Sequence, residues 1–422
     1  MVHPAAAGGG QPDRPPARPT TRERSTAHYA GAMVEQVIDA GVLRAPLPSR
    51  GPSGDSARAV FEQILRHGPR PRSELATLLQ LSGATLTRVT RDLLDAGLLR
   101  EMPPVTRERG RPQEPLDVDE DHAHFLGVKV TAQEVFAVVT TMRGNPHEEI
   151  AVPVRSAAPE DVIEAVIALA APVLAAHPRI AGIGVSLGGR VTGDGVVLSS
   201  SMLGWDTPVP LAERLTAALD RPVTVENDLI ALLQGVLWFG IGRRYDSFVL
   251  LTIGAGIAIG IVHDGRVMKG RTHLAGLTQT LPTATRDGRH VRLAEVAGGP
   301  ALVERARATG AIGPEGDLAA LLAAHAAGVP AALELGEEVA HALAVSAGAL
   351  VGTLDPQALL LGGEAIGMIS APGDRGERFR ALLEGQIAPV QRDIDVRLLS
   401  EDFDEWTRGA AVTAIQRFAA GV

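Results

Sequence analysis

Hydrophobic residues recur at helical spacing in two short stretches that begin near residue 56. SARAVFEQILRHG predicts a first helix, which ends at Gly68-Pro69 because glycine and proline terminate helices. RSELATLLQL, which begins at residue 72, predicts a second and shorter helix. The residues expected to face inward are Val60, Ile64, Leu65, Leu75, Leu78 and Leu79.

A third helix is predicted from Ser82, a good N-cap residue, to Gly97, a good C-terminal stop. Its apolar face holds Leu86, Val89 and Leu93, so the polar side chains between them must point outward. The following stretch, LLREMPPVTRERGRPQEPLDVD, predicts a strand, an Arg-rich loop and a second strand. Three helices and a β-hairpin form the outline of a winged helix-turn-helix, which we assign to residues 51–118.

Residues 119–422 alternate between strand-like and helix-like patterns, which predicts an α/β body. The order hairpin, helix, strand, helix occurs at about 122–220 and again from about 246, so two similar lobes with a cleft between them are expected. Residues 1–50 are rich in Pro, Gly, Ala and Arg and lack a sustained period, which predicts a disordered extension.

Composition narrows the class of protein. A chain of 422 residues exceeds what one hydrophobic core supports, and the absence of Cys excludes disulfides and thiolate zinc sites. The N-terminus lacks a signal-peptide pattern, and the longest apolar run, FVLLTIGAGIAIGIV, is too short and Gly-rich to span a bilayer. A soluble, cytoplasmic protein without membrane contact is therefore expected.

The formal net charge of −9 is distributed unevenly along the chain. Residues 51–115 carry ten Arg and eight acidic residues, a net charge of +2. Residues 116–422 carry a net charge of −13. The acidic body would be repelled by nucleic acid, but the small N-terminal domain would not.

The third helix has the side chains that a DNA-recognition helix needs on its outer face. A wing that carries Arg107, Arg109 and Arg111 could follow phosphates or enter a minor groove. The alternative is a helical module that contacts another protein, with solvated Arg side chains. The residues expected at DNA, besides Arg109 and Arg111, are Ser82, Thr85, Thr87, Arg88 and Arg91.

Residues 223–230, VTVENDLI, pass from a strand pattern to a helix pattern through Asn227 and Asp228. Asp is a strong N-cap residue and an acid in the first turn suits the helix dipole, so helix capping is one interpretation of this pair. Capping does not require an Asn before the Asp, and the interpretation preferred here is that both side chains contact a ligand in the cleft.

Several stretches of the body, taken together with the winged helix, resemble the ROK family of repressors, open reading frames and sugar kinases, in its xylose-repressor or N-acetylglucosamine-repressor form. They are GVSLGGRVTGDGVV, LGWDTPVPLAERL, VTVENDLIALLQG and TIGAGIAIGIVHDGRV. The resemblance implies a two-lobed, actin-like ATPase (ribonuclease-H-like) fold with a sugar in the cleft. It implies that Asn227 bonds sugar hydroxyls, that Asp228 matches the general base of the kinases, and that Gly189 belongs to the sugar-side loop. Gly254 and Gly256 correspond to the second phosphate loop.

Departures from the family pattern argue against kinase activity. The family kinases open this body with an Asp and a Gly-Gly-Thr phosphate loop; here Lys129 takes the Asp position and Ala132-Gln133 stand where Gly-Thr should be. Side chains thus fill the space that phosphates would need, so no catalytic residue and no cofactor are expected.

The family's second sugar loop and zinc site are also altered. Leu277 replaces a sugar-binding Glu and Thr280 a zinc-binding His, so that zinc site cannot form. Gln279 is either a remaining sugar contact or a solvated loop residue, and Glu295 lies one residue from the alignment position of another sugar contact, which Ala294 occupies. His122 and His124 are interpreted as strand-edge residues, and no metal site is expected.

The expected function is a DNA-binding transcriptional regulator, most simply a repressor of carbohydrate-related genes, that senses a sugar or sugar phosphate. Its expected partner is double-stranded operator DNA, bound as a homodimer or a higher homo-oligomer. One alternative is a sugar kinase with an accessory DNA-binding domain. Another is a DNA-binding protein whose body is only an oligomerisation platform.

Overall fold

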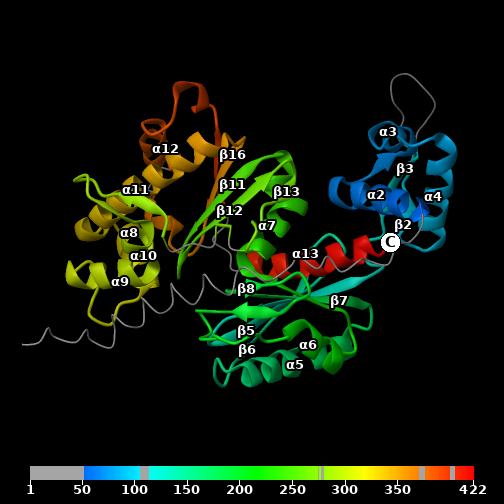
Figure 1. Cartoon of the computed structure of the whole chain (residues 1–422), viewed down its shortest axis with the longest axis horizontal. Helices are drawn as coiled ribbons and strands as arrows, with labels where there is room; N and C mark the ends of the chain where they lie inside the picture. The colour runs from blue at the N-terminus through cyan, green and yellow to red at the C-terminus, as the bar shows by residue number, and fades with distance from the viewer. Residues whose placement is uncertain (1–51, 105–113, 274, 277–279, 370–375, 400–403) are drawn as a thin grey trace, which may run out of the picture. The chain divides into compact units, whose positions relative to one another are not determined.

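The computed structural model describes residues 52–104, 114–273, 275–276, 280–369, 376–399 and 404–422. It has an α/β body of two lobes preceded by a small domain of helices and short strands (Figure 1). The α/β prediction for the body is confirmed, and the three helices and two strands of the predicted winged helix are present, together with a short strand at Arg70–Pro71 that was not predicted. The extension expected over residues 1–50 lies outside the described residues.

The small domain packs three helices against a three-stranded antiparallel sheet of order β1-β3-β2. Most of the predicted inward residues are buried, but Leu78 is 49% exposed, so its inward prediction is wrong. The helix ends at Leu78 and the chain turns there, which leaves the side chain outside the apolar face. The elements are α2 (Pro52–His67), β1 (Arg70–Pro71), α3 (Arg72–Leu78), α4 (Gly83–Asp95), β2 (Leu99–Glu101) and β3 (Pro115–Val118).

Lobe 1 is a five-stranded sheet of order β10-β7-β4-β5-β6, in which β10, β7 and β4 are parallel. Helices α5 and α6 pack on one face over a core of aliphatic residues. The elements are β4 (His124–Val130), β5 (Glu134–Thr140), β6 (Pro146–Pro153), α5 (Pro159–Ala176), β7 (Ile180–Leu187), β8 (Arg190–Val191), β9 (Val197–Ser199), α6 (Leu211–Leu219) and β10 (Val223–Asn227).

Lobe 2 repeats this plan with a sheet of order β13-β12-β11-β16-β17, whose outer face is covered by helices. The elements are η1 (Ile241–Arg244), β11 (Phe248–Ile253), β12 (Ile257–His263), β13 (Arg266–Val267), β14 (Pro282–Ala284), β15 (His290–Arg292), α8 (Leu293–Ala297), α9 (Gly299–Ala308), α10 (Leu318–Ala326), α11 (Pro330–Leu354), β16 (Ala358–Gly362), η2 (Ile366–Ile369), α12 (Glu377–Glu384), η3 (Pro389–Gln391) and β17 (Asp395–Leu398).

Within the described ranges no single helix is long and apolar enough to cross a membrane. Helices α10 (Leu318–Ala326) and α11 (Pro330–Leu354), bent by 103° at their junction, meet that criterion together, by length and composition only.

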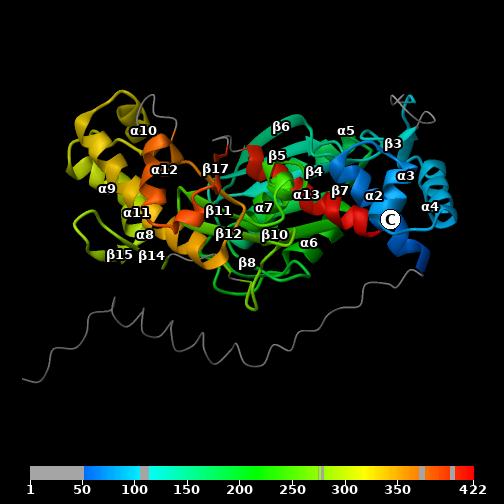
Figure 2. The same ribbon diagram turned by 90° about the horizontal axis from the view of Figure 1, so that it is seen from above.

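Helix α13 (Asp404–Ala420) covers the other face of the lobe 1 sheet, and α7 (Asp228–Trp238) packs on α13 and on β12 and β13 of lobe 2. Both views show α13 along this sheet, with the C-terminus beside the small domain (Figures 1 and 2). Gly127 and Gly184 are neighbours on β4 and β7, and a Cβ at Gly184 would lie 1.8 Å from the Ala410 carbonyl oxygen. Glycine is therefore required where α13 crosses these strands.

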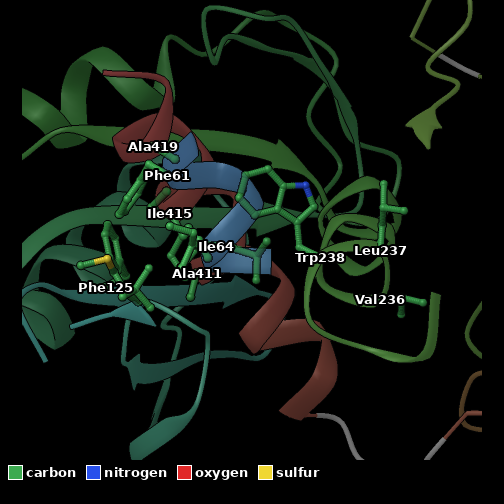
Figure 3. Packing of buried hydrophobic residues seen from close by; sticks show 14 of the residues in the cluster. Phe61, Ile64, Phe125, Val236, Leu237, Trp238, Ala411, Ile415 and Ala419 are labelled. Carbon is green, nitrogen blue, oxygen red and sulfur yellow. The ribbon is translucent and has the colours of Figure 1, made fainter. Parts of the chain in front are cut away.

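One hydrophobic cluster runs from the small domain into the body (Figure 3). Phe418 of α13 lies edge-on to both Phe61 of α2 and Phe125 of β4, with ring centroids 6.5 and 5.5 Å apart. Arg66 of α2 also stacks over Trp238 of α7, 5.4 Å from its centroid. The small domain thus shares a core with the helix that begins at Asp228.

Candidate functional site

The side chains of Lys129 and Asp228 form an ion pair at the carboxyl ends of the lobe 1 strands. Lys129 comes from β4 and Asp228 opens α7; their side chains are 7% and 15% exposed. The Lys129 ammonium also lies over the Trp406 ring of α13, 5.0 Å from its centroid. Burial of two opposite charges is sustained only by such pairing. The Asp228 carboxylate, which the resemblance matches to the general base of the kinases, is therefore paired with a cation.

Asn227 is the N-cap of α7 and Asp228 is the acid in its first turn, so the cap falls on the Asn and not on the Asp that the capping interpretation named. Its Oδ1 accepts a hydrogen bond from the Ile230 amide at 3.2 Å, and its Nδ2 donates to the Gly189 carbonyl at 2.9 Å. The structure thus brings Gly189, Asn227 and Asp228 together. Asn227 is only 4% exposed and both of its polar atoms have protein partners, so its amide is committed to shaping the chain.

Lys129, Ser186 and Glu226 lie side by side in register on β4, β7 and β10. Glu226 forms an ion pair with Lys269, which follows β13 in lobe 2. A second contact of this kind joins Arg190 of β8, whose Nε donates to the Thr272 carbonyl at 3.1 Å. These contacts tie the sugar-side edge of lobe 1 to the loop after β13.

In the loop between β11 and β12, which the resemblance matches to the second phosphate loop, both backbone groups of Gly254 are already bonded. The Gly254 amide donates to the Gly256 carbonyl at 3.0 Å, and the Gly254 carbonyl accepts from the Gly299 amide at 2.7 Å. The Glu364 carboxylate lies so close that a Cβ on Gly254 would be 1.6 Å from its Oε2. The adjacent cavity of about 630 Å³ is lined by Glu364, Glu304 and Asp317 against one cation, Arg307. This surplus of acids repels phosphate groups.

Helix α4 has the predicted arrangement of a recognition helix. Leu86, Val89 and Leu93 are buried, whereas Thr87, Arg88 and Arg91 are exposed. Ser82 caps the helix by accepting a hydrogen bond from the Thr85 amide at 3.1 Å. Arg88 reaches Asp92, with 3.7 Å between Nη1 and Oδ2. An exposed pair of this kind is weak, so Arg88 is available to a partner.

Some predicted site residues fall elsewhere. Arg107, Arg109, Arg111, Leu277 and Gln279 lie outside the described residues. Glu295, considered as a sugar contact, instead accepts from the Arg292 amide at 3.2 Å and so caps α8.

Sequence reasoning missed the residue that joins the small domain to the body, Arg143. It follows β5, its Nε donates to the Leu65 carbonyl at 3.1 Å, and its Nη2 donates to the Ile64 carbonyl at 3.0 Å, both at the end of α2. It also pairs with Asp117 on β3 and with Glu120. No pattern singles it out, because its partners are far apart in sequence. The contacts of Lys129 with Asp228 and Trp406 were not predicted either. The replacement of an acidic family residue by Lys129 was the one feature of the sequence that pointed to them.

Residues 125–416 match the family described as ROK family. The chain belongs to the ROK family. A transcriptional regulator of Mycobacterium tuberculosis (strain H37Rv) is 28% identical over 393 residues, which cover 87% of this chain and 86% of that protein. The first curated relatives match over shorter stretches, and the chain spans about half to two thirds of their length (45–65%).

Solved ROK structures share the fold. A ROK family transcriptional regulator, described as a homolog of the E. coli MLC protein, superposes with a TM-score of 0.72 at 23% identity over 87% of this chain and 97% of that one. A ROK family glucokinase from Streptomyces griseus, in complex with glucose and AMPPNP, gives 0.56 at 23% identity over 70% of this chain and all of that one. The regulator's match extends further over this chain than the kinase's, which agrees with the presence of the small domain.

Proposed function

We propose that this ROK protein is a DNA-binding transcriptional regulator whose small domain, residues 51–118, binds an operator and whose body, residues 119–422, senses a sugar or sugar derivative without phosphorylating it. The observation that carries the DNA-binding half is α4, which is anchored by three buried apolar residues and presents Thr87, Arg88 and Arg91 to solvent. Arg side chains at such positions read guanine edges in the major groove. The match along most of a mycobacterial regulator supports the same function.

The DNA-binding test begins with selection of duplexes from a random pool by the full chain, since the operator is unknown. We expect a near-palindromic sequence, because a homodimer would place two copies of α4 about one DNA turn apart. Arg88→Ala should then bind that sequence and a scrambled one with nearly equal affinity. Arg289→Ala, which removes an exposed cation from lobe 2, is the matched control and should retain the preference. Enrichment of no sequence would refute the proposal.

The ion pair of Lys129 and Asp228 supports sensing without catalysis. A general base must reach the substrate hydroxyl, and the Asp228 carboxylate is already in contact with the Lys129 ammonium. The pair still has hydrogen-bonding capacity for a sugar, because an ammonium has three donors and a carboxylate about four acceptor positions. Asn227 offers less, since both of its polar atoms are already bonded. We therefore place the effector against Lys129 and Asp228, near Gly189.

A thermal-shift panel of sugars and sugar phosphates tests the sensor half, because a ligand that binds the folded state raises its melting temperature. The expected result is a shift for the parent chain that is lost in Asp228→Ala, each compared with its own unliganded state. Absence of a shift across the panel would favour the oligomerisation platform. A coupled hexose and ATP assay should show no turnover; turnover that Asp228→Asn abolishes would instead establish a kinase.

A further inference from the structure

Two histidines and an aspartate converge where the chain leaves the small domain and enters lobe 1. Asp121 lies between β3 and β4, His124 opens β4, and His147 is the second residue of β6. One ligand atom from each lies within 4.8 Å of the other two. The His124 and His147 rings are tilted against each other with centroids 5.2 Å apart. This cluster is remote from the cleft and uses none of its residues.

An irregularity in strand pairing lies beside each of the two histidines. On β6 the register jumps from Glu148 to Pro146 opposite consecutive residues of β5, so His147 is the extra residue of a β-bulge. A second irregularity, on β7, lies opposite the start of β4 at His124. Bulges commonly redirect side chains beside functional sites. His124 thus departs from the strand-edge interpretation, because it is buried at the start of a central strand, whereas His122 is exposed.

His124 lacks a partner for a buried ring nitrogen. The residue is 8% exposed, and its Nε2 is inaccessible and has no hydrogen-bond partner. The nearest charged atom of Asp121, Oδ1, is 3.7 Å from Nε2, which is too far for a hydrogen bond. An unsatisfied buried nitrogen destabilises the folded state, so a ligand on Nε2 would relieve an existing penalty.

We propose that Asp121, His124 and His147 bind one divalent transition-metal ion of the zinc class. Two imidazoles and a carboxylate suit Zn²⁺, Ni²⁺ or Co²⁺, and Cys is not needed. Zn–N bonds of about 2.0–2.1 Å require the ligand atoms to move closer than they are here. Asp121 and His147 are exposed and free to rotate, whereas buried His124 is already in place. Arg179 opposes the ion, since its Nη1 donates to the Asp121 carbonyl at 2.9 Å and brings a positive charge close to the site.

A metal ion here would clamp the segment between β3 and β4, which is the covalent connection from the small domain to lobe 1. The Asp121 carboxylate and the His124 imidazole would then be held to His147 on β6, an edge strand of the sheet. The site is distinct from the cleft, so its loading is measured without an effector or DNA.

Isothermal titration calorimetry with ZnCl₂ on the untagged, chelator-treated full chain tests the proposal. The expected result is one ion per chain for the parent and at least a tenfold weaker Kd for His147→Ala, which removes an exposed ring and spares the core. His122→Ala is the matched control, because His122 is exposed in the same segment but outside the cluster, and it should bind as the parent does.

Thermal unfolding of the same three proteins provides a second measurement. Zn²⁺ should raise the melting temperature of the parent and of His122→Ala, and should leave His147→Ala unchanged. A parent Kd weaker than about 1 mM would overturn the proposal. Equal Kd values for the parent and His147→Ala would also overturn it, since the binding would then come from other histidines.

Discussion

Neutralising Lys129 should destabilise lobe 1 because it leaves the Asp228 carboxylate buried without its cation. Removing one partner of a buried ion pair typically costs about 3–5 kcal/mol. The two side chains are 7% and 15% exposed, so we expect about 3 kcal/mol, the lower end of that range, for Lys129→Met. Met preserves the length and apolar stem of Lys. Asp228→Asn should cost less, because the Trp406 ring continues to support the ammonium.

The decisive measurement is a double-mutant cycle followed by urea unfolding and tryptophan fluorescence. The signal comes from Trp205, Trp238 and Trp406, which lie in lobe 1 or on the helices packed against it. Lys129→Met combined with Asp228→Asn should recover about 2 kcal/mol relative to the sum of the single changes, because no unpaired charge remains. Additivity within about 0.5 kcal/mol would refute the reasoning. The exposed pair of Arg289 and Asp287 is the matched control, and the same cycle there should show no measurable coupling.

Three further changes test other parts of the structure. Gly184→Ala should prevent stable docking of α13 and cost more than about 3 kcal/mol, whereas Gly182→Ala on the same strand, whose nearest neighbour would be 3.6 Å away, should be tolerated in thermal unfolding. Arg143→Ala leaves Asp117, which is 6% exposed, without its cation, so about 3 kcal/mol should be lost and limited proteolysis should cleave faster after α2. Burial, followed by three nearby Arg side chains, lowers the pKa of His67 to about 4. Since the folded pKa lies below the unfolded value of 6.5, stability should be lost as pH falls from about 6.5 to 4. His67 is partly buried, so the loss should be about 1 kcal/mol after screening, and His67→Gln should abolish it in urea unfolding across that pH range.

The spacing of apolar residues predicted most of the helices and strands of the small domain, but few of the contacts made by Asn227 and Asp228. The apolar spacing of Leu86, Val89 and Leu93, with the cap at Ser82, fixes which face of α4 is exposed, and the structure confirms it. The failure at Leu78 arises because the helical period continues in the sequence past the point where the helix ends. Helical spacing says which residues share a face, but not where a helix stops.

The strand-to-helix junction at Asn227 and Asp228 could be located from the sequence, but its chemistry could not. Asn227 and Asp228 were placed correctly at the strand-to-helix junction, yet both residues have partners that depend on tertiary structure. Lys129 is 99 residues from Asp228, and Gly189 is 38 from Asn227. The sequence showed that Lys129 replaces an acid; only the fold shows that this Lys neutralises the remaining one. The same limit applies to Arg143, whose partners come from α2, β3 and the loop after it.

The position of α13 explains how an effector in the cleft could act on the small domain without touching it. One end of this helix carries Trp406 against Lys129, and the other carries Phe418 against Phe61 of α2. On the function proposed above, a sugar that competes with Lys129 for Asp228 would shift the ammonium, and with it the contact with Trp406. The sugar can change the affinity for DNA only if it binds one arrangement of α13 more tightly than another. Operator DNA would then change the affinity for the sugar by the same factor. Because Gly127 and Gly184 seat α13 directly on the strands, the helix has little room to deform locally, so the two ends are expected to move together.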